Sequence, residues 1–271
     1  MAYIAQATHG PVGAAALVVE SGAVVSLHGD QRFPMQSVYK LPIGMALLHQ
    51  VDLGRLNLNQ AVRIRPGDLV PPSRGSQIRD KYPHGTVMTV AGLLDAMISV
   101  SDGTASDILL KQAGGPVQVT AYLRGLGIRN IVVATSERAM AQNEQVQYRN
   151  WATPDAMVGL LRVFQQGRGL SASSRRLLLS LMVGCKTGVH QIKGLLPVGT
   201  VVAHKTGSSG TVRGLTRATN DAGLITLPDG RHLAVVVFVS DTRADTATRE
   251  AVIAKIARAA WGCRASLEGG K

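Results

Sequence analysis

Strand-like segments stand at both ends of this chain, and helical segments fill the middle. Residues 13–28, GAAALVVESGAVVSLH, have the composition of two short strands joined at Ser21-Gly22. Near the other end, the segments TVVAHK, LTRATNDAGLITL and HLAVVVFVSD also predict strands, and the turn Pro228-Asp229-Gly230 joins the last two. A chain with this order must leave a sheet, build a helical region and return to the sheet.

The middle segments carry helix signals. TVAGLLDAMISV opens at Thr89 and TPDAMVGLLRVFQQG opens at Thr153, residues that commonly cap helices. GTASDILLKQAGG ends on glycines, PVQVTAYLRGLG starts with proline, and SASSRRLLLSLMVG continues the helical run. The polar segment ATSERAMAQNEQVQYRNWATP breaks this pattern. A loop of that length inside a compact domain is uncommon and often functional.

This order of segments predicts an α/β (α+β) fold, with an antiparallel sheet flanked by helices and an all-helical lobe. The last segment, TATREAVIAKIARAAWG, predicts a helix that covers one face of the sheet. We expect residues 1–55 and 195–265 to form the sheet lobe. Residues 56–194 would form the helical lobe, with a long loop at about 135–152. A cleft between two lobes is the usual place for a binding site.

Charge and cysteine content narrow the function classes. The formal net charge is +12, but the basic residues are scattered and form no Lys/Arg block, so we expect no nucleic-acid binding. No run of about twenty apolar residues predicts a membrane span. Cys185 and Cys263 lie far apart, and the sequence leaves open whether they pair. No Cys/His spacing is typical of a metal site, so we expect no metal.

The segment FPMQSVYKLP places Lys40 three residues after Ser37, where a helix that ends near Gly54 is predicted to begin. Residues three apart share a helix face, so the Lys40 ammonium can approach the Ser37 hydroxyl. Backbone N–H groups in a first helical turn face an incoming ligand. Taken alone, this spacing is more often a capping serine followed by a solvated lysine.

Two further segments are candidates for a site. ISVSDGTASDILL contains a polar turn, Ser101-Asp102-Gly103, which alone predicts a helix cap by Ser101 or Asp102. VVAHKTGSSGT predicts a strand that delivers Lys205-Thr206-Gly207, with small residues that let a substrate lie against the strand. A second K-T-G copy, at 186–188, follows a helical segment, and we discount it for that reason.

In this order and with these gaps, the three segments resemble the S-x-x-K, S-D-N and K-T-G motifs of class A serine β-lactamases and penicillin-binding proteins. Gln36 precedes the serine, where many class A enzymes have cysteine. QVQYRNWATP, LLPVGTVVAHKTGSSGT and ATNDAGLITLPDG are similar to the PER/VEB-type extended-spectrum branch. The resemblance covers essentially the whole chain and implies the serine β-lactamase/penicillin-binding-protein-like fold.

The resemblance implies a mechanism through a serine acyl-enzyme, without a metal or an organic cofactor. Ser37 would attack the β-lactam carbonyl, and either Lys40 or Glu137 would activate it. Glu137 would then activate the water that hydrolyses the ester. Ser101 would pass a proton to the departing lactam nitrogen. The alternative interpretation of Glu137 is a surface carboxylate, or a structural ion pair with Arg138 or with the arginine at position 149.

The resemblance also implies which residues bind the substrate. Lys205 and Thr206 would bind its carboxylate, and the backbone N–H groups of Ser37 and Ser208 would form the oxyanion hole. The expected substrate-binding residues are Lys205, Thr206, Gly207, Ser208 and Gly103.

Three residues depart from the family pattern. Gly103 replaces the asparagine of S-D-N, whose side chain bonds the substrate acylamide and the lysine. Ala141 stands where the family has an asparagine or a histidine that helps hold the deacylating water; position 142 or 143 is a possible replacement. Gln191 stands where the related branch has a carboxylate-binding arginine, which Arg213 or Arg217 would have to replace. Together these changes predict weak or narrow turnover.

The first functional hypothesis is therefore a β-lactamase that hydrolyses penicillins or cephalosporins and confers antibiotic resistance. The alternatives are a penicillin-binding D,D-peptidase and a sensor or binding protein that is acylated once. The Glu137 loop argues against the peptidase, whereas Ala141 and Gly103 are the features that favour the sensor. The resemblance also implies a bacterial monomer that is periplasmic or secreted. Its partner would be a small-molecule β-lactam, with no nucleic acid and no membrane.

Overall fold

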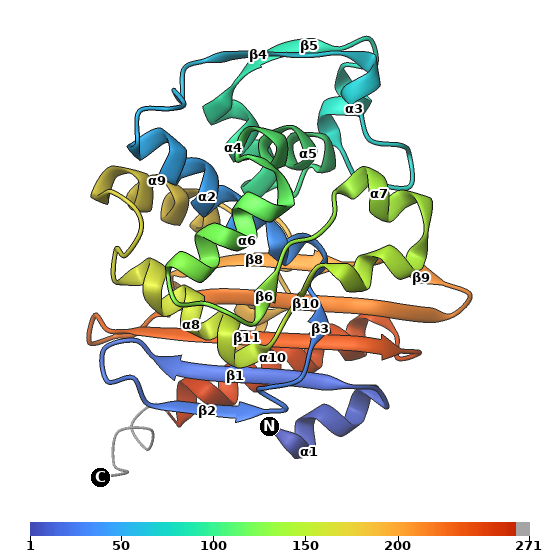
Figure 1. Ribbon diagram of the computed structural model, residues 1–271. Helices are drawn as coiled ribbons and strands as arrows, with labels where there is room; N and C mark the ends of the chain where they lie inside the picture. Colours follow the sequence, from blue (N-terminus) through green and yellow to red (C-terminus); the bar gives the residue numbers. More distant parts are fainter. Residues whose placement is uncertain (264–271) are drawn as a thin grey trace.

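A single antiparallel sheet collects strands from both ends of the chain, as Figure 1 shows. The computed structural model describes residues 1–263. The strand order is β2-β1-β11-β10-β8, with β9 paired to β10. The strands are β1 (Val12–Val18), β2 (Val24–Leu27), β8 (Val202–Ser208), β9 (Thr211–Val212), β10 (Leu215–Thr226) and β11 (His232–Thr242). The predicted N-terminal hairpin and the three C-terminal strands are confirmed.

Short strand pairs complete the β structure. One small sheet has the order β3-β7-β6 and another pairs β4 with β5. Their bounds are β3 (Phe33–Pro34), β4 (Ala61–Ile64), β5 (Thr86–Thr89), β6 (Ile131–Val132) and β7 (Trp151–Ala152). The β3–β7 pair ties the segment before Ser37 to the end of the predicted long loop.

Helices lie on both faces of the main sheet (Figure 1). Their bounds are α1 (Ala2–Ala5), α2 (Lys40–Asp52), α3 (Gln77–Lys81), α4 (Val90–Ser99), α5 (Gly103–Gln112), α6 (Gly115–Gly125), α7 (Glu137–Gln142), α8 (Pro154–Gln165), α9 (Ala172–Val183) and α10 (Thr246–Gly262). Short 3-10 turns lie at Gln6–Thr8, Gln36–Tyr39, Pro66–Asp68, Glu144–Arg149 and Ile192–Leu195.

The central strand β11 shows why the sheet needs helices on both faces. Successive side chains point to opposite faces of a strand. Val236 and Phe238 join the large core with the helical region, whereas Val235 and Val237 join a second core with α10. The run VVVFV is therefore buried on both sides. The predicted fold class is confirmed, and so is the terminal helix that covers one face.

Several helices start at the capping residues that the sequence predicts. The Thr89 hydroxyl accepts a hydrogen bond from the Gly92 amide, and Thr153 caps α8 in the same way. At the S-D-G turn the sequence leaves the choice between Ser101 and Asp102 open. Asp102 is the cap, because its carboxylate accepts from the Ala105 amide at 2.9 Å.

Two helices cross the predicted lobe boundary. α2 was expected in the sheet lobe but packs against α4, α5, α6 and α9, and α8 packs on β1 and β11. The division into residues 1–55 with 195–265 and residues 56–194 stays a prediction, and positions 264 and 265 lie outside the described residues. Within residues 1–263, Cys185 is buried, Cys263 is exposed, and both thiols are free.

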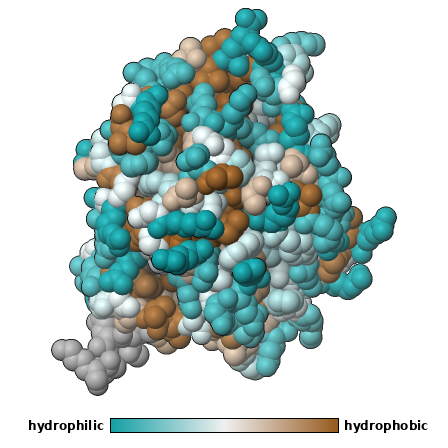
Figure 2. Space-filling model, in the orientation of Figure 1, coloured by the Kyte–Doolittle hydropathy of each residue, from teal (hydrophilic) through white to brown (hydrophobic). Residues whose placement is uncertain are grey.

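The surface in view is mixed in hydropathy, and the helices agree with the absence of a long apolar run in the sequence. Figure 2 shows hydrophilic and apolar side chains interspersed over the face in view. None of the helices in the described part of the chain is long and apolar enough to cross a bilayer.

Replacing Asp102 with alanine is expected to lower the free energy of unfolding by about 3 kcal/mol. The buried carboxylate accepts hydrogen bonds from Ser76 and from the amides of Ile78 and Ala105, and alanine leaves these buried donors unsatisfied. Urea denaturation measures the change. Asp80→Ala is the control, because that carboxylate is exposed and, within residues 1–263, its side-chain hydrogen bonds come from the neighbouring arginine. Its loss is expected to lower the free energy of unfolding only slightly. Equal losses in both variants would contradict the prediction.

Candidate active site

The candidate nucleophile lies in a short turn that leads directly into α2. Ser37 belongs to the 3-10 turn Gln36–Tyr39, so the α-helix proper begins at Lys40 rather than near the serine. Gln36 has a φ of 45°, in the left-handed region that costs a non-glycine residue energy. The Asn220 amide holds this turn by donating to the carbonyls of Pro34 and Met35. The backbone is therefore fixed in a conformation that places Ser37 in the wall of a hollow of about 620 Å³.

Strand β8 passes very close to this turn. A Cβ atom added at Gly207 would lie 2.6 Å from the Met35 carbonyl oxygen and 3.0 Å from the Ser37 amide nitrogen. The position therefore requires glycine, because any side chain would push the strand and the turn apart. Ser208, the last residue of β8, lines the same hollow as Ser37. The two segments that carry the expected oxyanion donors are thus adjacent.

Lys40 joins two of the other predicted residues. Its side chain is 1% exposed, and its ammonium donates to the Ser101 carbonyl at 2.7 Å and the Ser101 hydroxyl at 3.4 Å. The same nitrogen lies 3.0 Å from Oε1 of Glu137. Within residues 1–263, no hydrogen bond joins Lys40 to the Ser37 hydroxyl. The contact expected from the S-x-x-K spacing is therefore replaced by a bridge between Ser101 and Glu137.

Ser101 lies between two lysines. Its hydroxyl accepts hydrogen bonds from Lys205 Nζ at 3.0 Å and from Lys40 Nζ. The φ angle of Ser101 is 62°, which also lies in the left-handed region. With both ammonium groups directed at the oxygen, the hydroxyl proton is free for an acceptor in the hollow. Burial, followed by the nearby Lys40 charge, lowers the pKa of Lys205 to about 8.

The second K-T-G copy takes part in the site, contrary to expectation. The Thr187 and Thr206 hydroxyl oxygens lie 2.5 Å apart, and Thr187 and Gly188 line the same hollow as Ser37. The copy follows a helix, which is why the sequence argues against it. That helix, α9, packs against β8, and the segment after it brings Thr187 to Thr206. No local pattern in the sequence indicates this packing.

Glu137 is the first residue of α7, which Ser136 caps. The carboxylate is 2% exposed, and its backbone amide donates to Asp107 at 2.7 Å. Burial opposes ionisation, but the Lys40 and Arg74 charges outweigh it and lower the pKa of Glu137 to about 2. Burial of Asp107, in contrast, raises the pKa of that carboxyl to about 6.

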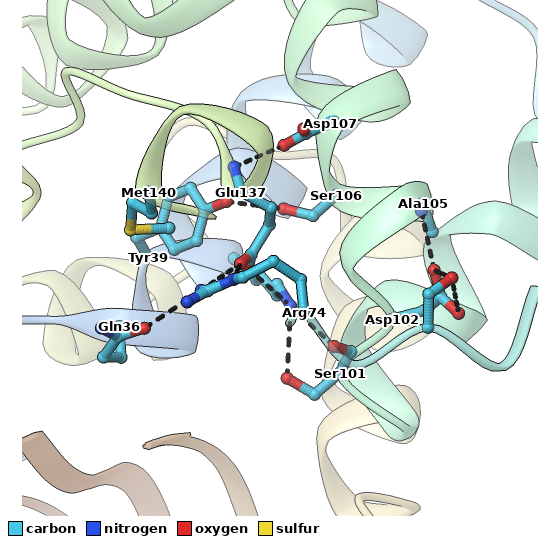
Figure 3. Close-up of polar contacts among 12 residues, drawn as sticks. Gln36, Tyr39, Arg74, Ser101, Asp102, Ala105, Ser106, Asp107, Glu137 and Met140 are labelled. Atoms are coloured by element: carbon cyan, nitrogen blue, oxygen red, sulfur yellow. Dashed lines mark hydrogen bonds and ion pairs between the residues drawn. The ribbon is translucent and has the colours of Figure 1, made fainter. Parts of the chain in front are cut away.

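The cation that pairs with Glu137 from outside the motifs is Arg74 (Figure 3). Arg74 Nε donates to Oε2 of Glu137 at 2.7 Å, and Nη2 contacts the same oxygen. The alternative reading of a pair with Arg138 is wrong, because the Arg138 side chain donates to the carbonyls of Gly67 and Leu69. Arg74 belongs to no recognised motif, and nothing in the sequence pointed to it.

The three departures from the family pattern have different surroundings. The Gly103 amide donates to the Gly75 carbonyl at 2.9 Å, and a Cβ at position 103 would lie 3.0 Å from that oxygen. Ala141 lines a smaller hollow of about 260 Å³. The Asn143 side chain accepts from the amide two residues on, so it serves as a local cap.

The expectation that another arginine replaces the one absent at Gln191 is not supported. Gln191 lines the main hollow, and its amide lies 3.4 Å from Glu250. Arg217 pairs with Glu144 at 2.8 Å beside the smaller hollow, and neither Arg217 nor Arg213 lines the main one. Across residues 1–263, no group of three or more His, Cys, Asp or Glu side chains is arranged to hold a metal ion.

Comparison with known proteins places this arrangement in a family. The sequence profile of the Beta-lactamase enzyme family matches residues 1–263. The extended-spectrum beta-lactamase PER-1 of Pseudomonas aeruginosa is 42% identical over 231 residues, covering 85% of this chain and 75% of that protein. Beta-lactamase VEB-1 of the same species is 36% identical over 260 residues, covering 95% of this chain and 87% of that protein.

Solved structures agree in fold. The crystal structure of a beta-lactamase from Chitinophaga pinensis DSM 2588 has a TM-score of 0.94 and 45% identity, covering 97% of each chain. The TLA-1 extended-spectrum beta-lactamase has a TM-score of 0.91 and 37% identity, covering 96% of this chain and 98% of that chain. The resemblance drawn from the motifs is confirmed: this chain belongs to the β-lactamase enzyme family, as a class A serine enzyme similar to the PER and VEB types.

Proposed function

We propose that this protein hydrolyses the β-lactam ring of penicillins or cephalosporins through an acyl-enzyme on Ser37, and so confers antibiotic resistance. The observation that carries the proposal is the contact network in one hollow. Ser37, Lys40, Ser101 and Glu137 all line it, and the Lys40 ammonium bridges Ser101 and Glu137. A nucleophile, a base and a proton donor thus share one site.

Acylation begins when the Ser37 oxygen attacks the lactam carbonyl carbon. We assign the base to Glu137, acting through a water molecule, because Lys40 already donates to Ser101 and faces the carboxylate. The amides of Ser37 and Ser208 stabilise the oxyanion. When the carbon–nitrogen bond breaks, Ser101 gives its proton to the nitrogen and is reprotonated by Lys40. Lys40 in turn recovers the Ser37 proton from Glu137, 3.0 Å away, so the carboxylate is ionised again before deacylation.

Deacylation requires water to attack the Ser37 ester. Glu137 accepts a proton from that water and returns it to the Ser37 oxygen as the ester carbon–oxygen bond breaks, which regenerates the hydroxyl. A positioned general base typically contributes a factor of about 10² to 10⁴.

Substrate binding uses the cationic side of the hollow. Lys205 is fully buried beneath Ser101, and the Thr206 hydroxyl faces the hollow beside Thr187. A β-lactam carboxylate would bind Thr206, while Lys205 keeps the local potential positive. We also propose that the protein works as a monomer exported to the bacterial periplasm or beyond, without a nucleic-acid or membrane partner.

The main alternative is a binding protein that is acylated once. Ala141 favours it, because a methyl group cannot hold the deacylating water. A D,D-peptidase is disfavoured by the buried Glu137 in the site.

The test is to mix purified protein with a chromogenic cephalosporin and to follow product well past one equivalent. Continued turnover is expected. A burst that stops at one equivalent, with an acyl adduct in the intact mass, would instead indicate the once-acylated protein. The absence of both burst and turnover would contradict the mechanism.

A further inference from the structure

The Arg74 guanidinium connects the hydrolytic carboxylate to the nucleophile turn. Besides its two contacts with Oε2 of Glu137, its Nη2 donates to the Gln36 side chain at 3.2 Å. Gln36 is the residue directly before Ser37, and its own amide donates to Gln147 at 2.6 Å. Figure 3 shows Arg74 between Gln36 and Glu137. The arginine also lines both the main hollow and the smaller one.

The loop that carries Arg74 is held firmly on both sides. The Gly75 carbonyl accepts from the Gly103 amide at 2.9 Å, and Arg79 Nη1 donates to the Arg74 carbonyl at 2.6 Å. Ser76 bonds the buried Asp102 carboxylate. Since a Cβ at position 103 would lie 3.0 Å from the Gly75 oxygen, the glycine that removes the family's amide is also what lets this loop approach.

The two carboxylate oxygens of Glu137 have different roles. Oε2 receives both Arg74 contacts, whereas the buried Oε1 faces the Lys40 ammonium at 3.0 Å and, within residues 1–263, has no other polar partner. A carboxylate oxygen can accept more than one hydrogen bond, so Oε1 keeps a lone pair for a water molecule. Position 141, four residues on, is alanine and offers no polar group to a water molecule at this carboxylate.

We propose that Arg74 is a positioning residue for acyl-enzyme hydrolysis, which clamps Glu137 by Oε2 so that Oε1 takes the proton from the attacking water. The inference rests on the hydrolytic role proposed for Glu137. Arg74 thus holds the carboxylate itself in a site where positions 103 and 141 offer no polar side chain. The planar guanidinium suits this task because it donates from two nitrogens at once.

The clamp also predicts a pH signature. The charged groups that face Glu137 are Lys40 from α2, Arg74 from its loop, Asp107 from α5 and, further away, Lys205 from β8. Removing Arg74 deletes one of the two cations that keep the pKa of Glu137 low. Hydrolysis needs the ionised carboxylate, so the acid limb of kcat must move to higher pH in the variant.

The experiment compares Arg74→Met and Arg74→Lys with the wild type, using a chromogenic cephalosporin and intact-mass detection of acyl-enzyme. Arg74→Met is expected to lower kcat about 100-fold, to accumulate acyl-enzyme and to raise the acid limb of kcat by at least about one pH unit. Arg74→Lys is expected to restore the acid limb and only part of kcat, because an ammonium is a point charge. Arg138→Met is the control: it removes a loop-anchoring arginine that does not contact the carboxylate.

Three results would overturn the inference. An unchanged kcat in Arg74→Met would mean that Glu137 needs no clamp. Faster hydrolysis of the acyl-enzyme would mean that Arg74 blocks the water. An equal loss in Arg138→Met, without any shift of the acid limb in Arg74→Met, would mean a structural role only. Failure of the proposed function is distinct, because the wild type itself would then not turn over beyond one equivalent.

Discussion

Replacing Ser37 with alanine is expected to abolish cephalosporin turnover, with a fall in kcat on the order of 10⁵-fold. In the proposed mechanism the Ser37 hydroxyl oxygen forms the acyl bond, and alanine has no atom that can do so. Residual rate would come only from the oxyanion donors and from substrate binding. Product release and the intact mass of the variant, which should show no acyl adduct, measure the effect.

The same variant should fold normally. No side-chain hydrogen bond in the described part of the chain involves the Ser37 hydroxyl, and the turn is held by the Asn220 amide and the β8 backbone instead. We therefore expect the urea midpoint of Ser37→Ala to stay near that of the wild type. Turnover that persists in a folded variant would exclude Ser37 as the nucleophile.

Glu137→Gln has the second largest expected effect, a fall in the deacylation rate of about 10³-fold. Glutamine has nearly the same shape and still accepts from Arg74, but its amide cannot take a proton from water. Because Glu137 is also the proposed acylation base, acylation slows as well, but the adjacent Lys40 remains to take the Ser37 proton. Deacylation falls further and becomes the slower step, so the acyl-enzyme accumulates and product stops near one equivalent. Stopped-flow burst kinetics and intact mass give the measurement. Undiminished turnover would move the base to Lys40 and reject the assignment.

The free energy of unfolding should depend on pH through the Glu137 carboxylate. The pKa of Glu137 is lowered in the fold to about 2 from an ordinary value of 4.5, against burial and through the Lys40 and Arg74 charges. A lowered carboxyl pKa contributes stability above the unfolded value, and this is lost as the pH falls through the folded value. Between pH 5 and pH 2 the wild type should therefore lose about 3 kcal/mol more than Glu137→Gln. Parallel urea titrations that fall together would contradict this linkage.

Much of the fold is readable from local patterns in the sequence. The run VVVFV in β11, the turn at Pro228-Asp229-Gly230 and the caps at Thr89 and Thr153 depend on residues a few positions apart. Such local patterns predict the elements and their order. The order of strands and helices in turn predicts that the chain returns to one sheet. The α-helix starts at Lys40 rather than near Ser37 as predicted, because the turn that contains Ser37 is a 3-10 turn.

The motifs also predicted which residues share the site. Ser37, Lys40, Ser101, Glu137 and the K-T-G strand all lie around one hollow, although their catalytic roles stay proposals. The discounted copy at Thr187 shows the limit of this reasoning. Its preceding segment is a helix, as expected, but that helix ends against β8 and delivers Thr187 to Thr206.

The elements, their order and the motif residues can be predicted from the chain alone, because backbone dihedrals, caps and hydrophobic periodicity act over a few residues. The ion-pair partners of the buried charges depend instead on long-range packing. Arg74 lies 63 residues from Glu137 in the chain, and Gly75 is 28 positions before Gly103. Burial of Glu137 makes an unpaired charge too costly, so the fold selects whichever cations packing brings within reach. Their spacing in the sequence therefore carries no signal of that pairing.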